Sequence, residues 1–467
     1  MVFFKQFYLG CLSHASYLLG SNGIGVVIDP QRDVDRYLEE ARVQGLTIRY
    51  VIETHLHADF VSGHRELAQR SGGEIVIGKL AAAQFRHHAV RDGDTLDAGA
   101  LHLAILETPG HTPEGISILV TDREHPELPA KLFTGDTLFI GDVGRPDLSG
   151  SAGFTAEQMA AALYDTLQKK ILTLDDSVEV YPAHGAGSLC GRNISSETWS
   201  TIGAQRLANY ALQPMSKAAF VALMTSGLPE APAYFSTDVK LNREGAPTLS
   251  DVQQPQPMTA SQVAEEMKRG ALVLDVRPSE IYGPEHIGGT CNIGLDGQFA
   301  SWAGSLLDFK RPIIIVAEST DDVVQAVLRL ARVGIASVRG TLQGGIEAWK
   351  KAGFPTLSTE QLAIEAFARI AASRDATVQI LDVRRSSEFA TGTVPGAQSI
   401  PLADLASHLN RVERGRRTYV MCGSGYRSSI ATSILEAAGY DEIVNVDGGM
   451  NAYREGGFEI VEPLGVA

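Results

Sequence analysis

Histidine and aspartate side chains gather in one short run near residue 55. His55, His57 and Asp59 occupy alternate positions in the segment 54–60. Imidazole nitrogens and carboxylate oxygens are common protein ligands of transition metals, so this spacing can present several ligands from a single loop. Phe60, which ends the run, has no lone pair to give a metal. The run therefore predicts part of a metal site whose other ligands come from elsewhere.

Three further candidates each stand at the end of an apolar, strand-like run: His111, Asp136 and His184. Strands fix positions, and the turns that follow them free side chains for binding. Together, His55, His111 and Asp136 make two imidazoles and a carboxylate, a set with open positions that suits ferrous iron. We therefore predict one Fe²⁺ per chain. The remaining groups would surround the metal, orient its ligands and hold water: His57, Asp59 and His184.

A second chemical signal is the segment 422–428, Cys-Gly-Ser-Gly-Tyr-Arg-Ser, between a strand-like run and a predicted helix. Consecutive backbone N–H groups at a helix N-terminus favour a thiolate, the nucleophilic form of cysteine. Arg427 and the same amides can hold a sulfur oxyanion. Cys422 is therefore the predicted nucleophile and Arg427 its anion-binding partner. A phosphatase loop is the competing interpretation, but it separates its cysteine and arginine by five residues instead of four.

The segment around Cys422 belongs to the second copy of an internal repeat. Leu-Asp-Val-Arg at 274–277 recurs at 381–384, and other short matches follow at similar offsets. In each copy, apolar runs alternate with amphipathic stretches, which predicts a parallel α/β sheet. A period near 100 residues indicates a duplicated domain and not a solenoid.

The first copy lacks the nucleophilic cysteine. We align Glu318 with Cys422 and Val323 with Arg427, and the segment 318–322 contains three carboxylates that would repel an anion. We therefore predict an inactive copy at 259–356 and an active copy at 359–460. Cys291 lies away from this loop and is predicted to be a packing residue.

Length and charge limit the function further. The chain has 467 residues and a net charge of −15, which suggests about three domains and argues against nucleic acids and anionic membranes as partners. No stretch approaches the roughly 18 apolar residues of a membrane span. Residues 7–29 are predicted to form two strands joined at 21–23, not a signal peptide. Four scattered cysteines do not make a disulfide framework, so the cytoplasm is the expected compartment.

With these motifs in hand, residues 1–245 resemble the persulfide dioxygenases, the iron-dependent branch of the glyoxalase II-like metallo-β-lactamase fold. The matching motifs are the run from His55, the turn at His111, Thr-Gly-Asp at 134–136, Gly-Arg-Pro-Asp at 144–147 and Tyr-Pro-Ala-His at 181–184. The resemblance implies an αββα sandwich with iron ligands at His55, His111 and Asp136. Both repeats resemble rhodanese sulfurtransferase domains. The expected fold class is thus α/β multidomain: a metallo-β-lactamase-like sandwich followed by two rhodanese-like parallel α/β domains.

The sequence departs from the dioxygenase pattern at two places. Many relatives keep histidine where Phe60 stands, which indicates that one metal position is kept and the second damaged. A glycine-rich insert at 185–191 follows His184 and contains Cys190. Cys190 is either a persulfide relay, with its pKa lowered by the insert's amides, or an ordinary loop thiol. Arg145 either binds a carboxylate of the thiol carrier or pairs with Asp147.

The combined interpretation is sulfide or persulfide detoxification. A low-molecular-weight persulfide would be oxidised by O2 to sulfite at the iron, and Cys422 would move sulfane sulfur to or from thiosulfate. The alternatives are a zinc-dependent thioester hydrolase like glyoxalase II and a sulfur-carrying scaffold with a structural metal. Structural zinc sites usually have four ligands, often cysteines, which this site lacks. The carrier thiol stays open among glutathione, coenzyme A, bacillithiol and polysulfides, and a homo-oligomer is expected.

Overall fold

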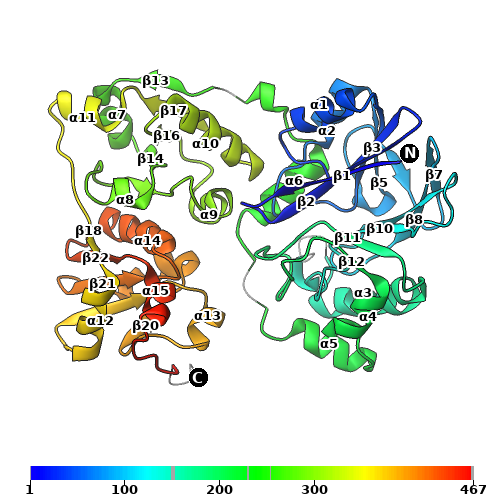
Figure 1. The fold of residues 1–467 in the computed structure, drawn as a ribbon. Coiled ribbons are helices and arrows are strands. Elements are labelled where there is room, and N and C mark those ends of the chain that lie inside the picture. Colours follow the sequence, from blue (N-terminus) through cyan, green and yellow to red (C-terminus); the bar gives the residue numbers. More distant parts are fainter. Residues whose placement is uncertain (1, 149–152, 229–230, 253, 464–467) are drawn as a thin grey trace. The chain divides into compact units, whose positions relative to one another are not determined.

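The computed structural model describes residues 2–148, 153–228, 231–252 and 254–463 (Figure 1). The chain divides into two compact units. The first comprises Met1–Val252 with Leu330–Gly334, and the second comprises Gln253–Arg329 with Ile335–Ala467. No helix within the described ranges is both long and apolar enough to cross a membrane.

Two six-stranded sheets form the centre of the first unit. The first sheet has the order β1(Phe3–Leu9), β2(His14–Ser21), β3(Ile24–Ile28), β4(Thr47–Glu53), β5(Glu74–Gly78) and β6(His88–Val90). The second has the order β12(Ser200–Thr201), β11(Glu179–Pro182), β10(Lys131–Gly135), β9(Ile116–Asp122), β8(Leu101–Glu107) and β7(Thr95–Ala98). The predicted turn at 21–23 is confirmed: β2 and β3 are antiparallel, and Asn22 and Gly23 join them with positive φ angles of 51° and 78°.

Apolar side chains from both sheets meet in one core, which includes Tyr17 and Ile52 from the first sheet and Leu103 and Phe133 from the second. Helices flank the two sheets. They are α1(Asp35–Val43), α2(His64–Ser71), α3(Ala156–Lys169), α4(Ile202–Ala208), α5(Lys217–Thr225) and α6(Phe235–Glu244). α1 and α2 pack on the first sheet, whereas α3 and α5 pack on the second. Each fully buried large apolar side chain stabilises this arrangement by about 1.5–3 kcal/mol. The predicted αββα sandwich is confirmed.

The second unit contains two five-stranded parallel sheets of the same order. The first is β13(Gln256–Met258), β17(Val338–Leu342), β16(Ile313–Val316), β14(Leu272–Asp275) and β15(Cys291–Asn292). The second is β18(Glu360–Leu362), β22(Ile443–Val446), β21(Arg417–Met421), β19(Val378–Asp382) and β20(Ala397–Ser399). Taken in chain order, each strand of one sheet has its counterpart in the other. The duplication and the parallel sheets predicted from sequence are confirmed.

Nine α-helices lie between or after these strands in the described part of the second unit. Those of the first copy are α7(Ala260–Lys268), α8(Ser279–Tyr282), α9(Phe299–Leu306), α10(Thr320–Arg332) and α11(Gly345–Lys351). Those of the second are α12(Ile364–Ser373), α13(Ser386–Ala390), α14(Tyr426–Ala437) and α15(Gly449–Glu455). The alternation of strand and helix places every βα loop at the carboxyl end of a parallel strand, where such sheets bind ligands.

Candidate metal centre and sulfur-transfer loop

Loops at strand ends bring the predicted metal ligands together in the first unit. His55 lies just beyond β4, and His111 lies in the turn after β8. Asp136 directly follows β10, and His184 follows β11. Because β10 and β11 are parallel neighbours, their carboxyl ends meet at the same edge of the sheet. The structure therefore gathers at one place four residues that are scattered along the sequence.

His55, His111 and Asp136 converge as two nitrogens around one carboxylate oxygen. His111 Nε2 lies 3.3 Å from Asp136 Oδ2, and His55 Nε2 lies 3.7 Å from the same atom. The three ligand atoms lie within 4.8 Å of one another, and all three residues are buried. This donor set fits one transition metal with positions left open.

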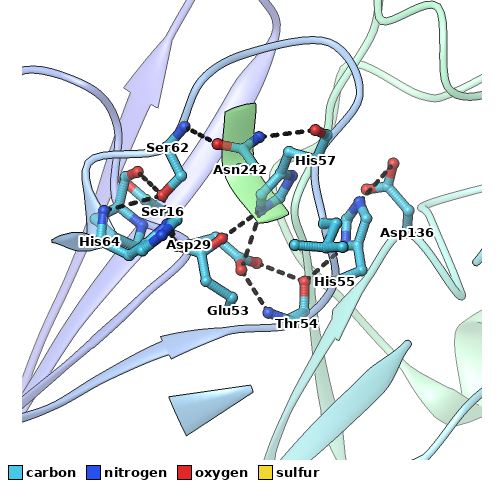
Figure 2. Close-up of polar contacts among 12 residues, drawn as sticks. Ser16, Asp29, Glu53, Thr54, His55, His57, Ser62, His64, Asp136 and Asn242 are labelled. Carbon is cyan, nitrogen blue, oxygen red and sulfur yellow. Dashed lines mark hydrogen bonds and ion pairs between the residues drawn. The ribbon is translucent and has the colours of Figure 1, made fainter. Parts of the chain in front are cut away.

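In His55 and His111, Nδ1 faces away from the cluster and is hydrogen-bonded. Nε2, which faces Asp136, therefore keeps its lone pair. His111 Nδ1 donates to the Arg145 carbonyl oxygen at 2.9 Å. Thr54 donates its hydroxyl hydrogen to Asp29, so at 2.9 Å it accepts from His55 Nδ1, as Figure 2 shows. Burial, together with neighbouring histidines, lowers the pKa of His55 well below its usual value. A neutral imidazole in a fixed tautomer is the form that binds a metal.

Two glycines of the recognised motifs allow this close packing. Gly135, at φ +51°, would place a Cβ 2.5 Å from Thr54 Oγ1. Gly144 would place one 2.0 Å from the backbone oxygen of Asp136. Any side chain at either position would displace a ligand or the residue that orients it. Steric crowding therefore explains why glycine stands at these positions of Thr-Gly-Asp and Gly-Arg-Pro-Asp.

His57 contacts two carboxylates that are not part of the His55–His111–Asp136 cluster. Its Nε2 lies 3.2 Å from Asp29 Oδ1 and 3.4 Å from Glu53 Oε2. Burial alone would lower the pKa of His57, but Asp29 and Glu53 raise it to about 9. Figure 2 shows this cluster, which His64 joins through Glu53 at 3.3 Å. Sequence reasoning missed Asp29, Glu53 and His64 because nothing in their spacing links residues that only the fold brings together.

A second group of potential ligands lies beside the other oxygen of Asp136. His184 Nε2 is 3.6 Å from Asp136 Oδ1 and 3.5 Å from Asp59 Oδ2. Cys190 is buried, and its Sγ lies within 4.8 Å of ligand atoms of Asp136 and His184. The Phe60 ring is also buried and contributes no ligand atom to this group.

The thiol of Cys190 is not activated by its loop. Burial, followed by the carboxylates of Asp59 and Asp136, raises the pKa of Cys190 well above its ordinary value. The lowering by backbone amides that the sequence suggested is therefore wrong, because two nearby negative charges and desolvation oppose the thiolate. A protonated thiol exchanges slowly with a persulfide.

Arg145 makes a local ion pair. Its Nε and Nη2 donate to the two carboxylate oxygens of Asp147 at 2.7 and 2.6 Å, and the side chain is buried. Its backbone carbonyl accepts the hydrogen bond from His111, and its backbone N–H donates to the Cys190 carbonyl. Arg145 thus ties the metal-binding turn to the glycine-rich insert.

In the second unit, Cys422 stands between β21 and α14. Its Sγ accepts a hydrogen bond from the Gly425 N–H at 3.2 Å and lies 3.5 Å from Ser428 Oγ. Gly425 has φ +102°, a conformation that favours glycine and turns the chain so that α14 begins at Tyr426. The predicted strand–loop–helix setting of the cysteine is confirmed.

Arg427 has a partner that the sequence did not reveal. Its two terminal nitrogens donate to the two oxygens of Glu388 at 2.6 and 2.8 Å. Burial alone would raise the pKa of Glu388, but the Arg427 guanidinium holds it below its usual range. The bidentate pair fixes the arginine beside the loop of Cys422. Glu388 and Arg427 are 39 positions apart, so no local pattern joins them.

The first copy differs in register from the alignment made on sequence. In each copy, the aspartate of Leu-Asp-Val-Arg pairs with the last residue of the neighbouring strand, β16 or β21. Counted from there, Ala317 occupies the position of Cys422, and Glu318 lies one residue beyond. The pairing of Glu318 with Cys422 is therefore wrong, because the loop before α10 is one residue shorter than the loop before α14.

That shorter loop is closed by its own side chains. Ser319 Oγ donates to Asp322 Oδ2 at 2.7 Å and accepts from the Asp322 N–H at 3.1 Å. Asp321 is the second residue of α10, as Arg427 is of α14, which replaces the earlier pairing of Arg427 with Val323. Carboxylates thus occupy the N-terminus of α10, where free backbone N–H groups could otherwise bind an anion.

Comparisons with known proteins agree with this architecture. The metallo-β-lactamase superfamily model matches residues 9–184, and the rhodanese-like domain model matches residues 259–352 and 368–455. A crystal structure of a metallo-β-lactamase from Staphylococcus aureus subsp. aureus COL has 34% sequence identity and a TM-score of 0.65. It covers 73% of this chain and 98% of its own.

Curated relatives match part of the chain. The mitochondrial persulfide dioxygenase of Bos taurus is 32% identical over 186 residues, covering 39% of this chain and 68% of the relative. The hydroxyacylglutathione hydrolase of Polaromonas sp. is 33% identical over 174 residues, covering 36% of this chain and 61% of the relative. With the site geometry and the repeats, these matches establish the family. The chain belongs to the metallo-β-lactamase superfamily, in the family that includes the persulfide dioxygenases, with two rhodanese-like domains after its first domain.

Proposed function

We propose that this chain oxidises a low-molecular-weight persulfide at one iron ion and transfers sulfane sulfur through Cys422. The observation that carries the first half is the convergence of His55, His111 and Asp136, with both outer imidazole nitrogens already hydrogen-bonded. The relationship to the persulfide dioxygenase of Bos taurus supports the same assignment. The overall reaction consumes R–S–SH, O2 and water, and yields R–SH, sulfite and two protons.

The protein's part in this reaction is to hold and orient. Ferrous iron, bound by the two imidazoles and the carboxylate, would supply the redox chemistry that adds oxygen to the terminal sulfur. Thr54 and the Arg145 carbonyl keep His55 and His111 in the tautomer that binds a metal. Burial of all three ligands excludes water from one side of the site.

Sulfur transfer in the second unit uses a separate set of groups. The Cys422 thiolate would attack the outer sulfur of R–S–SH, forming a cysteine persulfide and releasing R–SH. Sulfite would then take that outer sulfur, giving thiosulfate and regenerating the Cys422 thiolate. The Gly425 N–H already donates to Sγ, and Arg427 lies at the start of the same helix to hold the anionic substrate. The reverse direction, from thiosulfate, uses the same groups.

Metal content and oxygen uptake together test the proposal. We expect about one iron per chain and persulfide-dependent oxygen consumption in the purified protein. His111→Ala leaves two protein ligands, so it should lose most of the iron and the oxygen uptake. Two tightly held zinc ions, thioester hydrolysis and no oxygen uptake would contradict it.

The relationship to the hydroxyacylglutathione hydrolase keeps thioester hydrolysis as a second candidate. That reaction uses a metal-bound hydroxide, commonly between two metal ions. Phe60 removes one imidazole from the run at 55–60 and counts against it. An assay with an acylated thiol, run beside the oxygen electrode on the same protein, separates the two candidates.

A further inference from the structure

One face of α14, the helix that follows Cys422, contacts the first rhodanese-like copy. The contacting residues of both copies lie in the same compact unit. Those of α14 recur three or four positions apart, which places them on one side of the helix: Tyr426, Ser429, Ser433 and Glu436. Because Tyr426 stands between Gly425 and Arg427, this face begins inside the loop that carries the proposed nucleophile.

Tyr426 lies against a glycine-containing loop of the first copy. Its hydroxyl donates to the carbonyl oxygen of Gly294 at 2.8 Å. Its ring approaches Gly297 so closely that a Cβ at that position would stand 2.5 Å from two ring carbons. Any side chain at Gly297 would therefore force the ring to move. The backbone of the first copy thus holds Tyr426 both at its hydroxyl and along its ring.

Buried polar side chains continue the contact along the same face. Ser429 donates to Asn292 Oδ1 at 2.8 Å, and Ser433 Oγ accepts from the Asn292 backbone N–H at 3.0 Å. His286 Nε2 lies 2.9 Å from Glu436 Oε2. The two serines, the asparagine and the histidine are buried, and burying such groups is unfavourable unless they are hydrogen-bonded. Each copy therefore satisfies polar groups of the other.

The rhodanese-like fold does not itself require a polar face on this helix. The matching helix of the first copy, α10, begins at Thr320, as α14 begins at Tyr426. The later positions of the same face are apolar in α10, where they are occupied by Val323, Val327 and Leu330. The polar groups of α14 are therefore explained by the contact with the first copy and not by the fold that the two copies share.

We propose that Tyr426 is a positioning residue for sulfur transfer and that the inactive copy holds it in place. This inference rests on the proposed function, in which Arg427 binds the anionic substrate and the Gly425 N–H donates to the Cys422 sulfur. Tyr426 is the residue between Gly425 and Arg427, so fixing its side chain limits the movement of both. The first copy thereby sets the orientation of the groups that bind thiosulfate.

The retained framework of the inactive copy supports this role. Asn292 Nδ2 donates to the carbonyl oxygens of Asp275 and Arg277 at 3.1 and 2.9 Å. Both residues belong to the Leu-Asp-Val-Arg motif, so the motif orients the asparagine that contacts α14. The inactive copy thus contributes to sulfur transfer without a nucleophile of its own.

Tyr426→Phe in the full-length chain tests the proposal, because it removes the hydroxyl and keeps the ring. We expect the KM for thiosulfate to rise about threefold to tenfold, as for the loss of one hydrogen bond. The value of kcat should change less than about twofold, since Arg427 contributes binding in both the ground state and the transition state. Thr320→Val is the matched control, because it removes an exposed hydroxyl at the same helix position of the first copy. It should leave both constants unchanged.

Alkylation of Cys422 provides a second measurement that needs no turnover. Iodoacetate is an anion and iodoacetamide is neutral, and a thiolate reacts with both. A positioned Arg427 favours the anion, so Tyr426→Phe should lower the ratio of the iodoacetate rate to the iodoacetamide rate about threefold or more. Mass spectrometry of the peptide that contains Cys422 separates its reaction from that of the other cysteines.

The alkylation ratio decides between the outcomes. A lowered ratio supports the proposal, and a ratio equal to that of the unmodified chain overturns it. If denaturant unfolding shows that Tyr426→Phe destabilises the second unit, Ser429→Ala takes its place, because it removes the neighbouring contact and leaves Tyr426 intact. The same two results then decide. If the unmodified chain transfers no sulfur, the proposed function fails, whereas the ratio still reports how Arg427 is positioned.

Discussion

The two rhodanese-like copies share a framework and differ at one loop. Both have five parallel strands in the same order, and both bury an arginine–aspartate pair within Leu-Asp-Val-Arg. Arg277 Nη2 lies 2.7 Å from Asp275 Oδ2, and Arg384 Nη2 lies 2.6 Å from Asp382 Oδ2. The framework is therefore retained for folding, whether or not the copy carries a nucleophile.

Three positions around the loop change together between the copies, and each change removes a part of the sulfur chemistry. In the first copy they are Ala317 in place of Cys422, Asp321 in place of Arg427, and Ile281 in place of Glu388. The last pair is matched because each residue is the third of its helix, α8 or α13. The proposed nucleophile, the arginine proposed to bind the anion and the acid that pairs with this arginine are absent as a set. Under the proposed function, a few loop and helix-start residues would decide sulfur transfer, whereas packing preserves the fold of both copies.

The largest expected effect comes from removing the nucleophile. Cys422→Ser should reduce thiosulfate formation and use to background, because a hydroxyl is a far poorer nucleophile than a thiolate. Persulfide-dependent oxygen uptake should persist, with sulfite accumulating. Ala317→Ser is the matched change in the first copy and should leave sulfur transfer as it was. Loss of oxygen uptake in Cys422→Ser, with preformed persulfide, would show that the two activities are coupled.

The shared framework predicts equal stability effects in the two copies. Asp275→Asn and Asp382→Asn each leave a buried arginine without its carboxylate, which costs about 3–5 kcal/mol. Denaturant unfolding of the second unit should show losses of similar size for both variants. If Asp275→Asn lowered the unfolding free energy much less than Asp382→Asn, the arginine–aspartate pair would not be equally important for the stability of the first copy.

Glu388→Gln should weaken sulfur transfer about tenfold, since a charged hydrogen bond that positions Arg427 contributes roughly 1.5–3 kcal/mol. The expected signature is a raised KM for thiosulfate, with iron content unchanged. Ile281→Val, at the matched position, is the control. A rate equal to that of the unmodified chain would show that Arg427 is positioned without Glu388.

The same pair predicts a pH dependence of stability. The folded-state pKa of Glu388 lies below the ordinary value of 4.5, so its contribution is fully present above about pH 4.5. It is lost as the pH falls through the lowered folded value, because the unfolded chain takes up the proton first. The unfolding free energy of Glu388→Gln should therefore fall less steeply on the acid side than that of the unmodified chain. If the unfolding free energies of the two proteins fell equally steeply at low pH, this prediction would be wrong.

The smallest effect is expected at Glu318. The residue is exposed and lies one position beyond Ala317, so Glu318→Gln should change neither oxygen uptake nor sulfur transfer. A gain of sulfur transfer, measured in a Cys422→Ser background, would show that charge alone silences the first copy. Because Ala317 cannot act as a nucleophile, that result would contradict the conclusion that the missing cysteine makes the first copy inactive.

The sequence by itself determined the parts of this protein that repeat or that need particular residue types. Alternating apolar runs and the two Leu-Asp-Val-Arg motifs predicted the duplicated parallel sheets. Imidazoles and a carboxylate at strand ends predicted His55, His111 and Asp136 as a cluster, and the structure brings their ligand atoms together. Such features are visible because each depends on residue type and on local position along a strand or helix.

Only the tertiary structure decided which distant side chains meet. It paired Glu388 with Arg427, placed Asp29 and Glu53 around His57, and set Ala317 in the register of Cys422. It also surrounded Cys190 with carboxylates, which reversed the direction in which its pKa was expected to move. Charge interactions and burial depend on distances through space, and residues far apart in sequence acquire those distances only when the sheets and loops have packed.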